Sequence, residues 1–296
     1  MSMDGSAILT IWGAGGSAPA AGPERAVFGG ETVCFGLSAD AKDDDMPGPD
    51  LLVDLGSGAR SAGRAIMARA RTAGRPSSVA VLLSHLHLDH IIGAPFFGPF
   101  YAASGRVDVH CGLFEDPATL EARLKCLLAP PWFPVEPLSM GAARFHSFSP
   151  DVPFRAAGLT VTAAPLHHPG GCMGFRIEGR DWALAVIGDH EHGCPDSDAA
   201  ALRLARGATA MIYDASYDDA TYPMHKGWGH STWRKGIELA RAAGVRETLL
   251  HHHLPDHDDA ALAAIDAEAQ AADPSVRLAR QGMRLRLSAA GPEFLV

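Results

Sequence analysis

Short apolar runs alternate with Ala-rich amphipathic stretches along most of the chain. The runs are too short for buried helices and predict strands at 7–12, 33–38, 51–56, 79–84, 107–112, 159–166, 172–178, 182–189, 208–215, 247–253 and 283–288. The amphipathic stretches predict helices at 59–73, 117–128, 196–206, 231–243 and 258–272. Such alternation is typical of an α/β protein whose sheets are covered by helices. By itself it fits either a doubly wound sheet or a four-layer αββα sandwich.

Residues 39–50, ADAKDDDMPGPD, form the one strongly polar interruption and predict an exposed loop between two strands. We find no internal repeat and no low-complexity linker. A chain of 296 residues is long enough for one large layered domain or two ordinary ones.

The charge balance limits the classes of partner that the protein is expected to bind. Lys and Arg number 25 against 34 Asp and Glu, a net charge of −9, and no Lys/Arg run is present. Long nucleic acid is therefore a poor candidate for the main partner. The N-terminal segment lacks a secretory pattern, and no apolar stretch approaches the ~18 residues that would span a bilayer. Five widely spaced cysteines without a Cys-x-x-Cys pair indicate reduced thiols and predict a cytoplasmic protein.

The distribution of the fifteen histidines indicates candidate chemistry, because most of them lie in four clusters. The densest is SHLHLDH (84–90), directly after a predicted strand. Alternation along that strand would place His85, His87 and Asp89 on one side, with His90 following at the turn. Imidazole and carboxylate suit Zn²⁺, and also manganese or iron. Four such ligands exceed what one open catalytic ion takes from a single loop, so the segment predicts two ions.

Three further predicted strands also end in ligand-type residues. His167 and His168 follow 159–166, Asp189 ends 182–189, and the triplet His251–His253 ends 247–253. A lone strand-end histidine is more often a hydrogen-bonded surface residue than a ligand. Their coincidence with the first cluster favours one metal site at one edge of the sheets. Which histidine of the pair, and which of the triplet, faces the metal stays open.

The His-x-His-x-Asp-His segment resembles the signature of the metallo-β-lactamase superfamily. The resemblance extends over almost the whole chain, to a subgroup near ribonuclease Z and the cyclic ribosyl-phosphate phosphodiesterase of phosphonate breakdown. Its blocks here are IWGAGGSAPAAGPE, FGGETVC, LLVDLGSGAR, SHLHLDHIIGAPFFGPFY, PPWFPV, HHPGGCMGFRIE, GDHEH, IYDASY, GWGHSTW and HHHLPDHDD. It implies a four-layer αββα sandwich formed by a single domain, residues 1–296.

The resemblance also implies a ligand set. One ion would be held by His85, His87 and His168, the other by Asp89, His90 and His252, with Asp189 bridging them. His168 matches because it precedes Pro-Gly-Gly, and His252 matches when residues 255–259 are aligned; His167, His251 and His253 remain the alternatives.

Three positions depart from the subgroup's pattern. Gly15 stands where the subgroup usually has Arg, Gly188 where it has Thr, and Leu254 where it has Asp. These departures leave the ligand set intact and bear on which substrate is bound.

A second constellation bears on the reaction. In the ribonuclease Z branch an acidic residue orients a histidine that reaches the scissile phosphate, and Asp214 and His230 stand at the matching positions. Together with Asp89 they are the candidate catalytic residues. The alternative is that they only tie a strand to the start of helix 231–243, where Ser231 or Thr232 would cap.

These residues predict a metal-dependent hydrolase with two divalent ions, zinc in first place, and a metal-activated hydroxide that attacks a small phosphodiester. A lactone, thioester or other carbonyl-ester hydrolase is the nearest alternative. A mononuclear iron oxygenase would leave Asp89 and His90 idle, and a non-catalytic scaffold should have lost ligands. The expected partner is a small molecule, with neither membrane nor long nucleic acid; a homodimer is compatible with the sequence.

Overall fold

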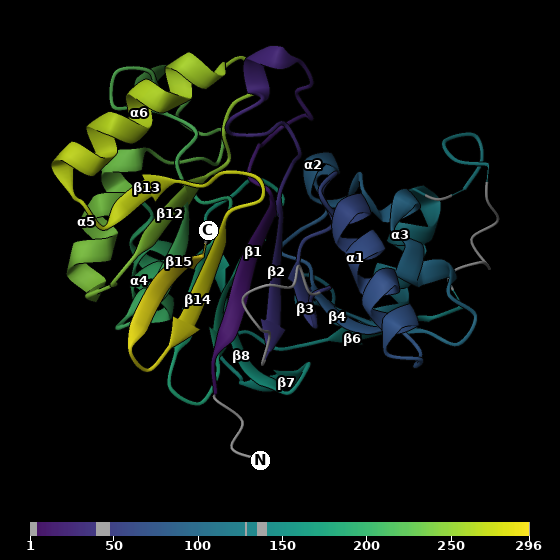
Figure 1. Ribbon diagram of the computed structural model, residues 1–296. Helices are drawn as coiled ribbons and strands as arrows, with labels where there is room; N and C mark the ends of the chain where they lie inside the picture. Colours follow the sequence, from purple (N-terminus) through teal and green to yellow (C-terminus); the bar gives the residue numbers. More distant parts are fainter. Residues whose placement is uncertain (1–4, 40–47, 128, 135–140, 296) are drawn as a thin grey trace.

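A computed structural model describes residues 5–39, 48–127, 129–134 and 141–295. Two mixed sheets pack face to face, and helices cover the outer face of each (Figure 1). The architecture is therefore the αββα sandwich. The expected loop at 39–50 falls largely on residues 40–47, which lie outside the described residues.

The first sheet has eight strands, and its β3 to β6 run parallel to one another. In spatial order they are β15 (Gly291–Leu295), β14 (Arg284–Ser288), β1 (Ala7–Gly13), β2 (Cys34–Ala39), β3 (Leu51–Val53), β4 (Ser78–Leu82), β5 (Arg106–Cys111) and β6 (Ala143–Ser147).

The second sheet has seven strands, and its β10 to β13 are parallel. In spatial order they are β13 (Val276–Leu278), β12 (Thr248–His251), β11 (Ala210–Asp214), β10 (Ala183–Ile187), β9 (Cys172–Glu178), β8 (Leu159–Leu166) and β7 (Phe154–Ala156).

Helices form the two outer layers. On the first sheet lie α1 (Ala59–Thr72) and α3 (Pro117–Leu127), and on the second α4 (Pro195–Ala205), α5 (Trp233–Ala243) and α6 (Asp259–Ala272). Short helices interrupt the loops: η1 (Pro23–Arg25), α2 (Leu88–Ile91), η2 (Ala94–Phe96), η3 (Gly98–Tyr101) and η5 (Tyr222–Met224). None of the helices in the described part of the chain has the length and apolar character needed to cross a membrane.

Alternation along the strands explains the layering. On β4, Ala80 and Leu82 point between the sheets, whereas Val79 and Val81 point toward α1. The second sheet repeats this on β10, β11 and β12, whose alternate residues face the first sheet or the helices α4 to α6. Strands buried on both faces read as continuous apolar runs, which is why they were recognisable in the sequence.

The expected runs at 159–166 and 172–178 coincide with β8 and β9. Four strands had no such run: β6, β7, β13 and β15 lie at or next to sheet edges. Their residues are partly exposed or few in number, so pairing with a neighbouring strand, rather than local pattern, makes them strands.

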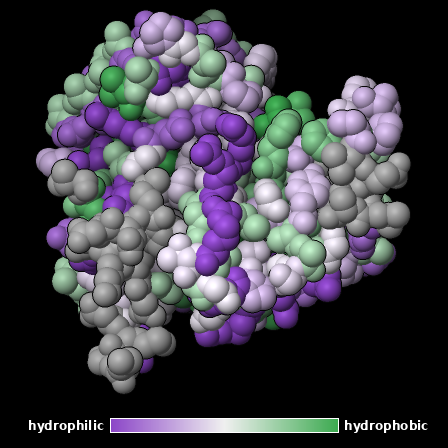
Figure 2. Space-filling model, turned by 45° about the vertical axis from the view of Figure 1, so that its right-hand side comes forward, coloured by the Kyte–Doolittle hydropathy of each residue, from purple (hydrophilic) through white to green (hydrophobic). Residues whose placement is uncertain are grey.

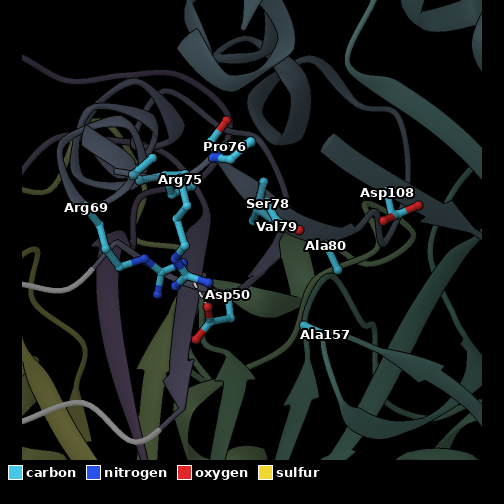
Figure 3. A pocket seen from close by; sticks show the side chains of 12 residues that line it. Asp50, Arg69, Arg75, Pro76, Ser78, Val79, Ala80, Asp108 and Ala157 are labelled. Carbon is cyan, nitrogen blue, oxygen red and sulfur yellow. Dashed lines mark ion pairs between the residues drawn. The ribbon is translucent and has the colours of Figure 1, made fainter. Parts of the chain in front are cut away.

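The surface is mixed. On the face in Figure 2, hydrophilic side chains form a continuous band down the middle, and hydrophobic groups lie in small clusters. A hollow of about 210 Å³ opens at the start of β4, lined among others by Arg69, Arg75 and Asp108 (Figure 3). Arg69 is already paired with Asp50 at 2.8 Å. The hollow lies at the opposite end of β4 from His85, so it is separate from the histidine-rich edge.

Candidate metal centre

The histidine-rich segment after β4 is a loop and a helical turn. The strand ends at Leu82, His85 and His87 lie in the loop, and Asp89 and His90 belong to α2. The expected alternation of His85, His87 and Asp89 along a strand was therefore wrong, whereas His90 does lie at the turn into the next element. One turn of helix, entered from an extended His87 (φ −64°, ψ 153°), aims Asp89 and His90 inward instead.

The other expected ligands follow strands of the second sheet. His168 comes after β8, Asp189 after β10 and His252 after β12, and each is at least nine-tenths buried. The strands β8, β10 and β12 run in the same direction, so their carboxyl ends meet at one edge. The stacking of the two sheets brings this edge against the loop after β4.

His85, His87, His168 and Asp189 form one cluster, in which the candidate ligand atoms all lie within 4.8 Å of one another. His168 Nε2 lies 2.9 Å from His87 Nδ1 and 3.5 Å from Asp189 Oδ2. His85 Nε2 lies 3.6 Å from the same carboxylate oxygen.

Asp89, His90 and His252 form a second cluster, of three residues, whose candidate ligand atoms also lie within 4.8 Å of one another. His252 Nε2 lies 3.3 Å from Asp89 Oδ2. Asp189 also reaches this cluster, with Oδ1 3.2 Å from His90 Nε2 and Oδ2 3.5 Å from His252 Nε2. One carboxylate thus touches histidines of both clusters.

The donor atoms at the centre fit a divalent cation. Among the described residues, no hydrogen-bond partner is found for the buried Nε2 atoms of His85, His90 and His252 or for Oδ1 of Asp189. An unsatisfied buried polar group costs about 1–3 kcal/mol, and here several converge on one point. A divalent metal ion would satisfy this set of imidazole and carboxylate donors.

The electrostatics of the cluster also favour a cation. Burial, reinforced by His90, lowers the pKa of His85 to about 2, so this imidazole is neutral and free to ligate. Burial also lowers the pKa of His252, but Asp189 and Asp89 outweigh it and raise the value to about 9. The carboxylates therefore stabilise a positive charge at a buried position.

Outer partners fix the orientation of the ligands, and the sequence analysis assigned none of them. His90 Nδ1 donates to Asp54 Oδ2 at 2.8 Å, and Ser84 Oγ donates to the same oxygen at 2.8 Å. Asp54 is buried and has φ +61°, which is rare outside glycine. Such second contacts hold the ring and its tautomer, leaving Nε2 for the metal. The sequence signal that could have identified Asp54 is its position within the segment LLVDLG (51–56).

Ser216 and Gly229 do the same for the second sheet. His252 Nδ1 lies 2.8 Å from Ser216 Oγ, which donates to Asp214 Oδ1 at 2.8 Å. His168 Nδ1 donates to the Gly229 carbonyl at 2.8 Å. Each ligand histidine named here therefore keeps its Nε2 directed at the cluster.

Gly16 offers a direct test of this packing. A Cβ atom at Gly16 would lie 2.1 Å from His252 Nδ1, whereas one at Gly188 would meet nothing within 4 Å. Gly16→Ala should therefore displace His252 and weaken metal binding more than ~10-fold, the scale of outer-contact losses. Gly188→Ala, next to Asp189, is the matched control and should keep its metal. Metal titration with elemental analysis, alongside circular dichroism to verify folding, distinguishes them; equal affinities would contradict the packing.

Asp214 and His230 form a hydrogen-bonded pair beside the clusters. His230 Nδ1 donates to Asp214 Oδ2 at 2.8 Å, and the His230 ring stacks on His252 with centroids 4.3 Å apart. Burial raises the pKa of Asp214, but His230 outweighs it and holds the value at about 2. Helix α5 is capped independently of this pair, because the Thr232 hydroxyl accepts a hydrogen bond from the Lys235 backbone N–H.

The alternative histidines point elsewhere. His167 is exposed and pairs with the Glu191 carbonyl at 3.2 Å. His251 packs edge-on against Phe35 at 5.2 Å, and His253 Nε2 donates to the Ala279 carbonyl at 2.8 Å. Within the described residues, neither cluster includes any of the three.

Comparisons with known proteins agree with this fold. Residues 47–253 match the family described as "Beta-lactamase superfamily domain". Ribonuclease BN of Escherichia coli is 27% identical over 256 residues, covering 67% of this chain and 78% of that protein.

Among solved structures, the metallo-β-lactamase fold protein YhfI from Bacillus subtilis is similar with a TM-score of 0.66, 22% identity and coverage of 95% and 99%. A diphosphatase from the PhnP family gives a TM-score of 0.61 at 18% identity, with coverage of 95% and 97%. The chain therefore belongs to the metallo-β-lactamase superfamily.

Proposed function

We propose that this protein is a phosphodiesterase that hydrolyses a small phosphodiester with two divalent ions, zinc in first place. The observation that carries the proposal is the Asp214–His230 pair, stacked against the histidine of the second cluster. A dinuclear site alone serves many hydrolases. A histidine oriented by a buried carboxylate beside it supplies the proton that a poor leaving group needs.

We assign the ligands by cluster. One ion would be held by His85, His87 and His168, the other by Asp89, His90 and His252, with Asp189 shared between them. When bound, such a pair of ions lowers the pKa of water toward about 7 and neutralises charge on the phosphate. Counting the shared Asp189, each ion would have four protein donors, so a position for substrate or water would open when the ion expands to five-coordinate.

The chain's own residues supply the proton step. The attacking water loses one proton to solvent, and its oxygen forms the new bond to phosphorus while the bond to the leaving oxygen breaks; after turnover His230 regains a proton from solvent. His230, held through Nδ1 by Asp214, gives the proton on Nε2 to that leaving oxygen.

Two further observations support a small substrate in a cytoplasmic enzyme. A net charge of −9 disfavours a long polyanion, and two of the similar proteins are named as a ribonuclease and a diphosphatase. All five cysteines are free thiols, three of them buried. The inter-sheet core is shared by both sheets, so we propose one catalytic domain.

A substrate screen tests the proposal. Protein loaded with Zn²⁺ or Mn²⁺, and the same protein treated with chelator, would be offered cyclic nucleotides, simple phosphodiesters, lactones and thioesters. We expect metal-dependent hydrolysis of phosphodiesters to be fastest. Faster turnover of a lactone or thioester would refute the phosphodiesterase and favour a carbonyl-ester hydrolase.

The metal count is a second prediction. Elemental analysis of protein prepared without chelator should give about two ions per chain, because the two clusters have separate histidines and share only Asp189. Asp89→Ala should lower the ratio toward one. A ratio of one that Asp89→Ala leaves unchanged would exclude the dinuclear site.

A further inference from the structure

Trp228 is held at the surface by a rigid turn two residues before His230. Its side chain is 62% exposed, and it lies between Gly227 and Gly229, which have φ +90° and +89°. The buried Glu191 carboxylate accepts hydrogen bonds from both flanking amides, at 2.7 Å from Gly227 and 2.8 Å from Gly229. Glu191 also accepts from Tyr222 at 3.0 Å. The backbone on both sides of this tryptophan is therefore fixed by one carboxylate.

A chain of ring contacts links Trp228 to the reaction centre. Its ring meets His225 edge-on at 5.0 Å, His225 stacks on Tyr217 at 4.4 Å, and Tyr217 lies 6.3 Å from His230. The next residue, Gly229, binds His168 through its carbonyl. Trp228 thus stands at the edge of the metal centre, at a place set by packing.

Trp228 belongs to a small set of exposed apolar side chains among the described residues. Among the described residues, seven large hydrophobic side chains are exposed, and Leu88, Met224 and Trp228 are three of them. Leu88 follows His87, the exposed member of the first cluster. Single exposed hydrophobic residues are ordinary in proteins. Trp228 differs because its backbone is fixed two residues from the catalytic His230. A ring held at such a place suits a stacking surface.

We infer that Trp228 forms a stacking subsite for a planar ring attached to the phosphate, so that the substrate is an aryl or nucleoside phosphodiester. The inference rests on the proposed function for its reaction, but the ring subsite is a separate claim about binding. Stacking of a base on an aromatic side chain tightens binding by roughly 5- to 100-fold.

Two substrates with one leaving group isolate the stacking. Bis(4-nitrophenyl) phosphate and methyl 4-nitrophenyl phosphate lose the same nitrophenolate and differ in whether a second ring is present. In the metal-loaded enzyme, Trp228→Ala should raise KM for the first substrate about 5- to 50-fold and change KM for the second little, with kcat nearly unchanged. Trp228→Phe should retain most of the preference. Trp132→Ala removes a tryptophan that is 78% exposed and has no ring contact with any residue of the two clusters, and should change KM for neither substrate.

Equilibrium binding separates this claim from the reaction. Calorimetric titration of metal-loaded protein with phenyl phosphate and methyl phosphate should give tighter binding of phenyl phosphate, a preference lost in Trp228→Ala and kept in Trp132→Ala. If no phosphodiester is turned over but this pattern holds, the proposed reaction fails and the subsite stands. Turnover or binding without a ring preference, or equal losses for both ligands in Trp228→Ala, would overturn the subsite.

Discussion

Replacing Asp189 with alanine should abolish turnover and release one or both metal ions. Asp189 is the carboxylate that touches both clusters, with Oδ1 beside His90 and Oδ2 beside His85, His168 and His252. Removing it takes a donor from each ion and the negative charge between them. The loss should exceed the ~10–100-fold typical when only an outer partner of a ligand is removed. Metal content by elemental analysis and turnover of a phosphodiester measure the two effects.

Asp54→Asn is the graded control. The substitution removes the negative charge that accepts a hydrogen bond from His90 Nδ1, and asparagine tolerates the positive φ at this position. We expect the smaller, outer-partner loss with both ions retained at saturating metal. Near-normal activity in Asp189→Ala, with a full metal complement, would mean that another carboxylate, such as Asp214, bridges the ions. Circular dichroism and a thermal unfolding curve verify that either variant is folded.

Removing His230 should slow poor leaving groups far more than good ones. General acid assistance is typically worth ~10²–10⁴-fold, and nitrophenolate departs without a proton. His230→Ala should therefore lose most of its rate on a dialkyl phosphodiester and comparatively little on bis(4-nitrophenyl) phosphate. Asp214→Asn should show the same pattern more weakly, because it leaves the imidazole in place but removes the charge that orients it.

The comparison must be made at equal metal loading, because loss of metal would slow both substrates. His230 also lies within reach of Asp189 and His252, close enough to act as a ligand itself. Unchanged metal content in His230→Ala is thus part of the expected result. Equal losses on the two esters would refute the acid role, and loss of an ion would make His230 a ligand.

The sequence alone determined the α/β class, most strands of both sheets and the segments from which the candidate ligands come. Strands buried on two faces carry continuous apolar runs, and helices that cover a sheet carry an apolar stripe, so both leave a local signal. The edge strands β6, β7, β13 and β15 left none, because pairing with a neighbour forms them.

Only the tertiary structure decided which donors face one another. The sequence left the pair His167/His168 and the triplet His251–His253 open, and it placed Asp89 on the strand, whereas α2 turns both Asp89 and His90 inward. Asp54 meets His90 from 36 residues away, and the Gly229 carbonyl meets His168 from 61 residues away. Such contacts depend on how two sheets stack at one edge. Side-chain periodicity records which face of its own strand a residue occupies and carries no information about the segment that packs against it.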